Sequence, residues 1–190
     1  MALDYYEKRA NAIREQWFPE HAPIFETQGN MQALIWAKPG TSIYKITYII
    51  KANRLMVFGD VGDAIYEWSN LLTWEWLAGL DLGYFASKCC ASEKGRQYRE
   101  WDTKEAQKWL DGYFAEHSDD KPKFEELFNP DENLASGEAW INWMANNGDE
   151  IFGSDCFELA DIGYVHDMRC QSHLIGLKMA IERKITAAAA

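Results

Sequence analysis

Residues 43–58 limit the possible folds most, because they have the pattern of a β-hairpin. The segment Ile43 to Ile50 is rich in β-branched and aromatic residues, and alternate positions starting at Tyr44 fall on one face. Ala52-Asn53-Arg54 has the chemistry of a turn, and Leu55 to Phe58 predicts the returning strand. This part of the chain is therefore expected to contribute antiparallel β-structure.

Helical patterns surround the hairpin and dominate the rest of the chain. Asp4 to Phe18 has apolar residues at helical spacing, with Asp4 as the expected N-cap. The short apolar run at Ala33 to Ala37 belongs instead to the strand-like block that contains the hairpin. Gly59 to Trp68 predicts a strand-to-helix turn, and Phe124 to Phe128 a short turn before Pro130. Further helices are predicted at Trp74 to Leu80, Asp81 to Ser92, Asp102 to His117, Ser136 to Asn146 and Cys156 to Ile185, the last with a break near Gly163 or Gly176.

Strands that come early and helices that follow predict an α+β fold. We expect an early β-hairpin or small antiparallel sheet packed against a mostly helical C-terminal two-thirds. A length of 190 residues with 47% hydrophobic composition suits a single domain, 1–190, in which Ala187 to Ala190 is expected to be a cloning remnant.

The compartment follows from what the sequence lacks. No apolar run approaches the roughly 18 residues that cross a bilayer, and the first residues have no apolar signal core. The four cysteines include the adjacent pair Cys89-Cys90, which does not suit a disulfide scaffold. We expect a cytoplasmic protein with reduced thiols and no membrane partner.

Charge is distributed very unevenly along the chain. Residues 100–161 contain 17 acidic and 4 basic residues, whereas the remainder contains 13 acidic and 15 basic ones. Phosphate repels such an acidic segment, so direct binding of nucleic acid is not expected. The segment suits a basic protein surface or imitates a polyanion, and a solvated face that aids solubility is the structural alternative. The candidate partner-binding residues are Asp119, Asp120, Glu125, Glu126, Asp131 and Glu132.

A glycine-rich turn gives a second candidate site. Gly59-Asp60-Val61-Gly62-Asp63 follows a predicted strand, where backbone amides and a helix start would favour phosphate. The phosphate-loop and dinucleotide patterns are incomplete, and the two aspartates would also serve as helix caps. A basic and aromatic cluster could add charge from Lys88, Lys94, Arg96 and Arg99, interleaved with Tyr84, Tyr98 and Trp101.

Metal and catalytic signals are weak. His166, Cys170 and His173, at positions i, i+4 and i+7, share one face of the last predicted helix, with Cys156 or Asp155 as the candidate fourth zinc ligand. Polar residues on the inner face of a crowded helix explain the same spacing. A Cys/His/Asp nucleophile set from Cys89 or Cys90 has no distinctive pattern. We therefore expect no cofactor and no recognisable catalytic residues.

Two segments give the chain a resemblance. GDVGDAIYEW at 59–68 and DLGYFASKCCASEKGR at 81–96 resemble proteins encoded by phages and prophages, over about Tyr44 to Trp101. That family has no assigned activity and no catalytic residues to carry over. Small acidic phage proteins without enzyme motifs are often inhibitors of bacterial defence, anti-CRISPR proteins among them, so the resemblance implies such a role by association.

Two functions of different classes follow. The first is a phage-encoded, non-enzymatic binding protein, cytoplasmic in the bacterial host, that blocks a host defence protein or complex with a basic surface. The second is a protein that binds or hydrolyses a nucleotide or nucleotide-like signal, using Gly59, Asp60, Gly62 and Asp63 with Lys94, Arg96 and Arg99.

Overall fold

The computed structural model describes residues 2–93, 98–154 and 156–189. The fold is α+β, with a six-stranded antiparallel sheet in residues 22–92 and a mostly helical part over 103–188. Lys94, Arg96 and Asp155, which the sequence suggested as ligand-binding residues, lie outside the described residues.

Each strand of the large sheet pairs with the next one in sequence, in the order β1 to β6. The strands are β1 (Ala22–Gln28), β2 (Met31–Ala37), β3 (Ile46–Lys51), β4 (Arg54–Gly59), β5 (Ala64–Glu67) and β6 (Cys89–Ser92). The predicted hairpin is confirmed as β3 and β4, with Tyr48 opposite Val57 and Ile50 opposite Leu55.

The helices of the first part of the chain are short apart from α1. They are α1 (Ala2–Ala12), continued by the π-helical turn η1 (Ile13–Trp17), and then α2 (Trp74–Ala78) and α3 (Leu82–Ser87). Thr73 caps α2, and Asp81 caps α3 by accepting a hydrogen bond from the Tyr84 N–H at 2.8 Å. Because α1 begins at Ala2, the prediction that Asp4 is its N-cap is wrong.

The remaining elements are mostly helical. They are β7 (Arg99–Trp101), α4 (Thr103–Glu116), α5 (Lys121–Leu127), α6 (Pro130–Asn133), α7 (Gly137–Phe152), the 3₁₀ turn η2 (Cys156–Asp161), β8 (Tyr164–His166) and α8 (Met168–Ala189). Strands β7 and β8 form a separate two-stranded sheet.

The chain forms two compact units. Unit 1 contains residues 1–98 and 166–190, and unit 2 contains residues 99–165. Each has its own hydrophobic core. The prediction of a single domain concerns whether these units fold as one, and it stays a prediction.

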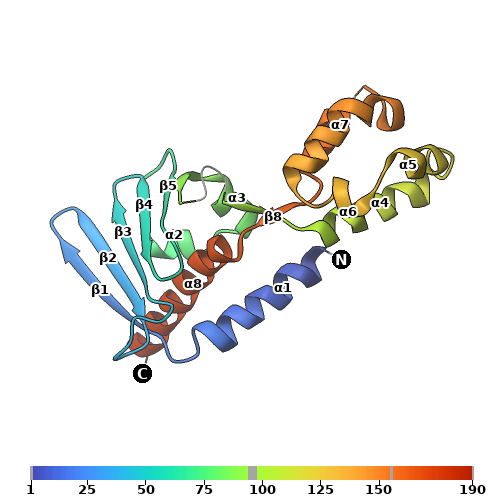
Figure 1. Ribbon diagram of the computed structural model, residues 1–190. Coiled ribbons are helices and arrows are strands. Elements are labelled where there is room, and N and C mark those ends of the chain that lie inside the picture. Colours follow the sequence, from blue (N-terminus) through green and yellow to red (C-terminus); the bar gives the residue numbers. More distant parts are fainter. Residues whose placement is uncertain (1, 94–97, 155, 190) are drawn as a thin grey trace. The chain divides into compact units, whose positions relative to one another are not determined.

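Helix α8 covers the inner face of the large sheet (Figure 1). Alternate residues of the strands are buried on this face, as a period of two requires: Leu34, Trp36, Ile46, Tyr48, Ile50, Leu55, Val57 and Tyr66. Tyr48 donates a hydrogen bond to the backbone carbonyl of His173 in α8, at 2.8 Å. The helix approaches closely at Gly176, where an added Cβ would lie 2.6 Å from Tyr48 Oη.

Several predicted elements differ from the structure. Residues 64–67 form β5 rather than the start of a helix, because Ala64 and Tyr66 are buried and pair with β4. The helix predicted to reach Ser92 ends at Ser87, and β6 follows as the edge strand. Strand β1 was not predicted, and its Pro23 is compatible with the opposite edge of the sheet.

The last two long helices also differ from their predicted bounds. Helix α7 continues through Gly148 to Phe152, because Gly148 packs against Cys156 and Ile151 is buried. The break predicted near Gly163 is present, whereas Gly176 lies inside α8. Phe124 to Phe128, predicted as a turn, largely belongs to α5. Within the described ranges, no helix combines the length and the apolar character needed to cross a bilayer.

Two glycine substitutions test the close contact between α8 and the sheet. Gly176→Ala is expected to lower the free energy of unfolding by about 1–3 kcal/mol, since its Cβ would displace the Tyr48 hydroxyl and crowd Trp36. Gly112→Ala in α4, where nothing lies within 4 Å, is the matched control and should raise it by about 0.5–1 kcal/mol. Chemical denaturation measures the free energy of unfolding of both variants. If both substitutions changed it by the same amount in the same direction, the close packing at Gly176 would be contradicted.

Candidate functional site

The six candidate partner-binding residues all belong to unit 2 and are all exposed. We call them the acidic surface: Asp119, Asp120, Glu125, Glu126, Asp131 and Glu132. Asp119 and Asp120 come directly before α5, with Asp120 as its N-cap residue. Glu125 and Glu126 lie on α5, and Asp131 and Glu132 lie in the first turn of α6. Negative charge at a helix N-terminus interacts favourably with the helix dipole, so four of these residues also stabilise their own helices.

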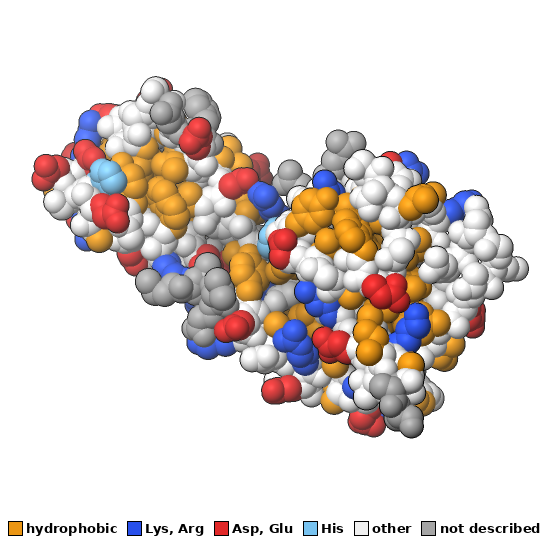
Figure 2. Space-filling view, turned by 180° about the vertical axis from the view of Figure 1, so that it is seen from behind, with side chains coloured by type: hydrophobic (Ala, Val, Ile, Leu, Met, Phe, Trp, Pro, Cys, Tyr) orange, Lys and Arg blue, Asp and Glu red, His pale blue; other side chains and the backbone are white. Residues whose placement is uncertain are grey.

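Few of these carboxylates are neutralised inside unit 2. Glu125 pairs with Lys121 at 3.7 Å, and the other five make no ion pair with any residue that the structure describes. The Asp120 side chain makes no capping hydrogen bond. In Figure 2, hydrophobic side chains gather on the visible face of unit 2 (left in the view) with acidic side chains around them. The acidic surface is therefore free to meet an external positive charge.

An aromatic core lies beneath the acidic surface. Phe124, between Glu125 and Lys123, stacks on Phe128 with ring centroids 4.2 Å apart and meets Trp143 edge to face at 5.4 Å. The indole N–H of Trp143 donates to the Leu127 carbonyl at 3.0 Å. The indole of Trp140 similarly donates to Leu159 at 2.9 Å. These contacts fix α5 and the segments around it, because a buried indole satisfies its polar atom while its ring packs.

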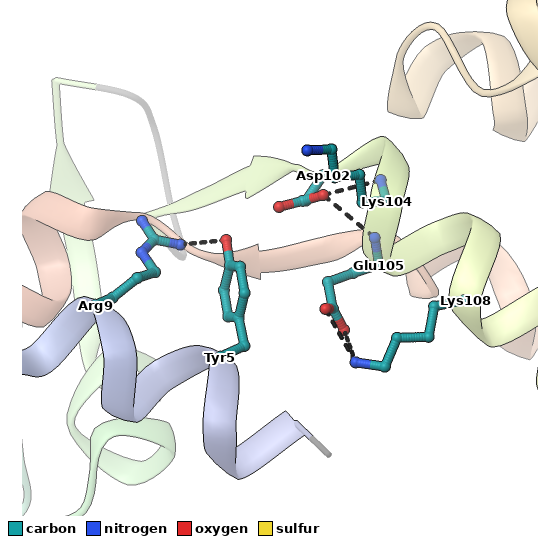
Figure 3. A network of polar contacts seen from close by, with 6 residues as sticks. All are labelled: Tyr5, Arg9, Asp102, Lys104, Glu105 and Lys108. Atoms are coloured by element: carbon teal, nitrogen blue, oxygen red, sulfur yellow. Dashed lines mark hydrogen bonds and ion pairs between the residues drawn. The ribbon is translucent and has the colours of Figure 1, made fainter.

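Helix α4 is fixed at its N-terminus by local polar contacts (Figure 3). Asp102 Oδ1 accepts hydrogen bonds from the N–H groups of Lys104 and Glu105, at 2.9 and 3.2 Å. Lys108 Nζ contacts both carboxylate oxygens of Glu105 at 3.0 Å. Asp102 is thus the N-cap of α4, at the position where the sequence predicted that helix to begin, and Glu105 pairs within its own helix.

The glycine-rich turn at 59–63 connects two strands, β4 and β5, and does not lead into a helix. Three of its amides already have partners. Gly59 N–H donates to Asp63 Oδ1 at 3.3 Å, and Asp60 N–H donates to the Lys45 carbonyl at 2.9 Å. The N–H of Gly62 donates to the Gly59 carbonyl at 3.2 Å. Asp60 Oδ2 in turn accepts from the Tyr44 N–H at 2.7 Å.

The prediction that the two aspartates cap a following helix is wrong, because a strand follows. They close the turn instead. The nucleotide hypothesis requires the dipole of a helix start and open backbone amides to hold a phosphate. The turn has no helix start, and the amides named above are occupied.

The described members of the basic and aromatic cluster have separate local roles. Lys88 lies over the Tyr84 ring at 4.7 Å, and Arg99 pairs with Asp161 at 2.7 Å. Tyr98 is fully buried in the core of unit 1. Trp101 donates its indole N–H to the Leu134 carbonyl at 2.9 Å within unit 2. No contact of these residues favours the nucleotide hypothesis.

The three metal candidates do not lie on one helix. His166 is in β8, whereas Cys170 and His173 are in α8 and fully buried. Tyr66 Oη lies 3.0 Å from His173 Nδ1 and 3.6 Å from Cys170 Sγ. No group of three or more metal-ligating side chains is present in the described part of the chain.

Burial keeps this cluster uncharged. It lowers the pKa of His173 to about 4, although backbone groups of Val61 and Gly62 oppose the shift. Burial also raises the pKa of the Cys170 thiol to about 12. A protonated thiol is a poor nucleophile and a poor zinc ligand, so the pair serves the core. Of the other two candidate thiols, Cys90 Sγ donates to the Ile65 carbonyl at 3.3 Å. Cys89 lies opposite Tyr66 in the pairing of β5 with β6, and its Sγ donates to the Ala91 carbonyl at 3.4 Å.

Tryptophan is a frequent anchor of protein interfaces, but most of the nine tryptophans of this chain pack inside. Five of the nine are buried: Trp36, Trp68, Trp74, Trp140 and Trp143. Only Trp76 is classed as exposed, at 36%. Aromatic content therefore explains the two cores rather than a partner surface.

The buried histidine makes stability depend on pH. Because the folded pKa of His173 lies below its ordinary value of 6.5, the unfolded state binds more protons between about pH 4 and 6.5, and stability falls as the pH falls through that range. The free-energy difference between the wild type and His173→Gln should shrink by about 2 kcal/mol from pH 7 to pH 5. Urea denaturation at both pH values measures it. A difference that stays constant would mean that His173 is not held neutral.

Comparison with known proteins leaves the candidate site to be interpreted from its own geometry. No protein-family model matches the sequence, no curated protein matches it, and no solved structure matches the fold.

Proposed function

We propose that this chain is a binding protein that blocks a bacterial defence factor, with its acidic surface facing a basic surface of that target. The observation that carries the proposal is the coincidence of charge and structure. Unit 2, residues 99–165, holds 17 acidic and 5 basic residues, whereas the rest of the chain holds 13 acidic and 14 basic ones. The charge thus belongs to one compact body rather than to a linker or tail.

The few basic residues of unit 2 do little to offset this charge. Four of the five form ion pairs with acidic residues of the same unit: Arg99, Lys108, Lys121 and Lys123. Surface pairs of this kind contribute little stability, so most of the acidic excess remains a net field. Such a field repels nucleic acid and attracts the basic surfaces that bind nucleic acid.

Rigid support favours recognition by this surface. The helices that carry the acidic surface are anchored by Phe124, Trp140 and Trp143. A surface that is already ordered loses little conformational entropy on binding, which favours affinity. The resemblance to phage proteins is the reason to propose a bacterial defence factor as the target. The acidic charge is the reason to propose contact through a basic surface of that target.

Neutralising the unpaired carboxylates tests the proposal. The test variant changes five residues to their amides and leaves Glu125 with its lysine partner: Asp119→Asn, Asp120→Asn, Glu126→Gln, Asp131→Asn and Glu132→Gln. We expect capture of a stoichiometric target from nuclease-treated phage-host lysate to fall at least about tenfold, because each charged contact at an interface contributes through complementarity. Capture by wild type should also weaken steeply as salt rises.

The control variant has the same change in charge on unit 1. It replaces five exposed glutamates by glutamine: Glu15, Glu20, Glu26, Glu75 and Glu182. Full capture by the control and loss by the test variant would support the acidic surface as the contact. Equal capture by both variants, or a target that double-stranded DNA does not displace, would refute charge mimicry.

A further inference from the structure

Unit 1 contains a groove that has no part in the proposed function. It lies between α1 and α8, with Leu82 of α3 also lining it, and its volume is about 560 Å³. Leu82, Leu174 and Ile175 give it an apolar lining. Small-molecule sites usually have volumes of about 300–1,000 Å³ and a mainly apolar lining with a few polar groups. The size and lining of the groove therefore suit a small organic molecule.

Two cations, Arg14 and Lys178, line the same groove together with one carboxylate, Glu7. Neither Arg14 of η1 nor Lys178 of α8 forms an ion pair with any described residue. Burial and, next, the charge of Arg14 lower the pKa of Lys178, although Asp81 and Glu182 act in the opposite direction. The two positive charges thus repel each other at a partly desolvated site. A bound anion would remove this repulsion, and a guanidinium is well shaped to hold a carboxylate through two parallel hydrogen bonds.

A buried amide in the wall of the groove has an unpaired acceptor that is shielded from solvent. Gln171 lines it and is only 4% exposed. Its Nε2 donates to the Tyr6 carbonyl at 2.8 Å, while its Oε1 has no hydrogen-bond partner. An unpartnered buried oxygen costs about 1–3 kcal/mol, so a ligand that donates a hydrogen bond there would recover part of that cost.

The walls of the groove are held together by side-chain contacts. Besides the bond from Gln171 to Tyr6, the Tyr6 hydroxyl accepts a hydrogen bond from the His166 N–H at 3.1 Å. These contacts join α1 to β8 and to the first turn of α8. The groove is therefore a preformed feature of unit 1, as small-molecule sites usually are.

We propose that this groove binds a small organic anion: a carboxylate with a flat apolar body and a hydrogen-bond donor at its far end. Arg14 and Lys178 take the carboxylate, the leucine and isoleucine side chains contact the apolar body, and Gln171 Oε1 accepts from the donor. Glu7 also lines the groove and disfavours a second negative charge on the ligand. The site is independent of the acidic surface, so either proposal can fail without the other.

The probe for this site is 6-hydroxy-2-naphthoate, which has these three features. Isothermal titration calorimetry on the full chain should give one site per chain. The neutral amide of the same molecule should bind at least about tenfold more weakly, because it loses the charge-assisted contact. Inorganic phosphate should not compete, since it lacks the apolar body.

The test variant is Arg14→Gln with Lys178→Gln, which keeps much of the side-chain length and removes both charges. It should weaken binding of the naphthoate at least about tenfold and leave binding of the amide unchanged. The matched control is Lys51→Gln with Lys184→Gln, which has the same charge change on unit 1 outside the groove, and it should bind as wild type does.

Three results would overturn the proposal: no naphthoate binding at millimolar concentration, equal binding of acid and amide, or equal loss in both double variants. If the test variant does not fold, amide chemical-shift mapping on the wild type replaces it. Shifts centred on α1 and the first half of α8 would support the groove, and shifts centred elsewhere would overturn it.

Discussion

The packing of α8 on the inner face of the large sheet is the contact on which unit 1 depends. The buried strand residues share one core with the inner side of this helix, and Gly176 lets the helix backbone approach Trp36 and Tyr48. Unit 2 lies between Tyr98 and His166 in sequence, so the core of unit 1 closes only when the chain returns from unit 2. This contact therefore joins parts of the chain that are far apart, and such contacts carry a large entropic cost of closure.

The arrangement also separates the tasks of the two units. Unit 2 carries nearly all of the acidic excess on helices held by aromatic packing, whereas unit 1 is close to neutral and holds a groove with two unpaired cations. Like charges repel within unit 2, and its stability must come from the aromatic core that offsets this repulsion. The proposed recognition of a basic target would use this acidic excess.

Buried polar groups in unit 1 are kept neutral. His173, Cys170 and Tyr66 lie together beneath the turn at 59–63, and burial disfavours the charged form of each. Their contacts hold α8 to β5, which explains the histidine and cysteine spacing that the sequence offered as a metal site. The same residue types would be ligands at an exposed helix face, so burial decides between the two roles.

Local sequence patterns determined the hairpin of β3 and β4, the start of α4 after Asp102 and the boundaries of the acidic segment. Each depends on neighbours within a few residues, where turn, capping and charge chemistry act directly. Only the tertiary structure decided that residues 64–67 and 89–92 are strands, because four residues are too few for their period to be recognised and pairing with β4 and β5 overrides it. It alone also placed Arg14 beside Lys178 and Gln171, since a groove between helices far apart in sequence exists only after they pack.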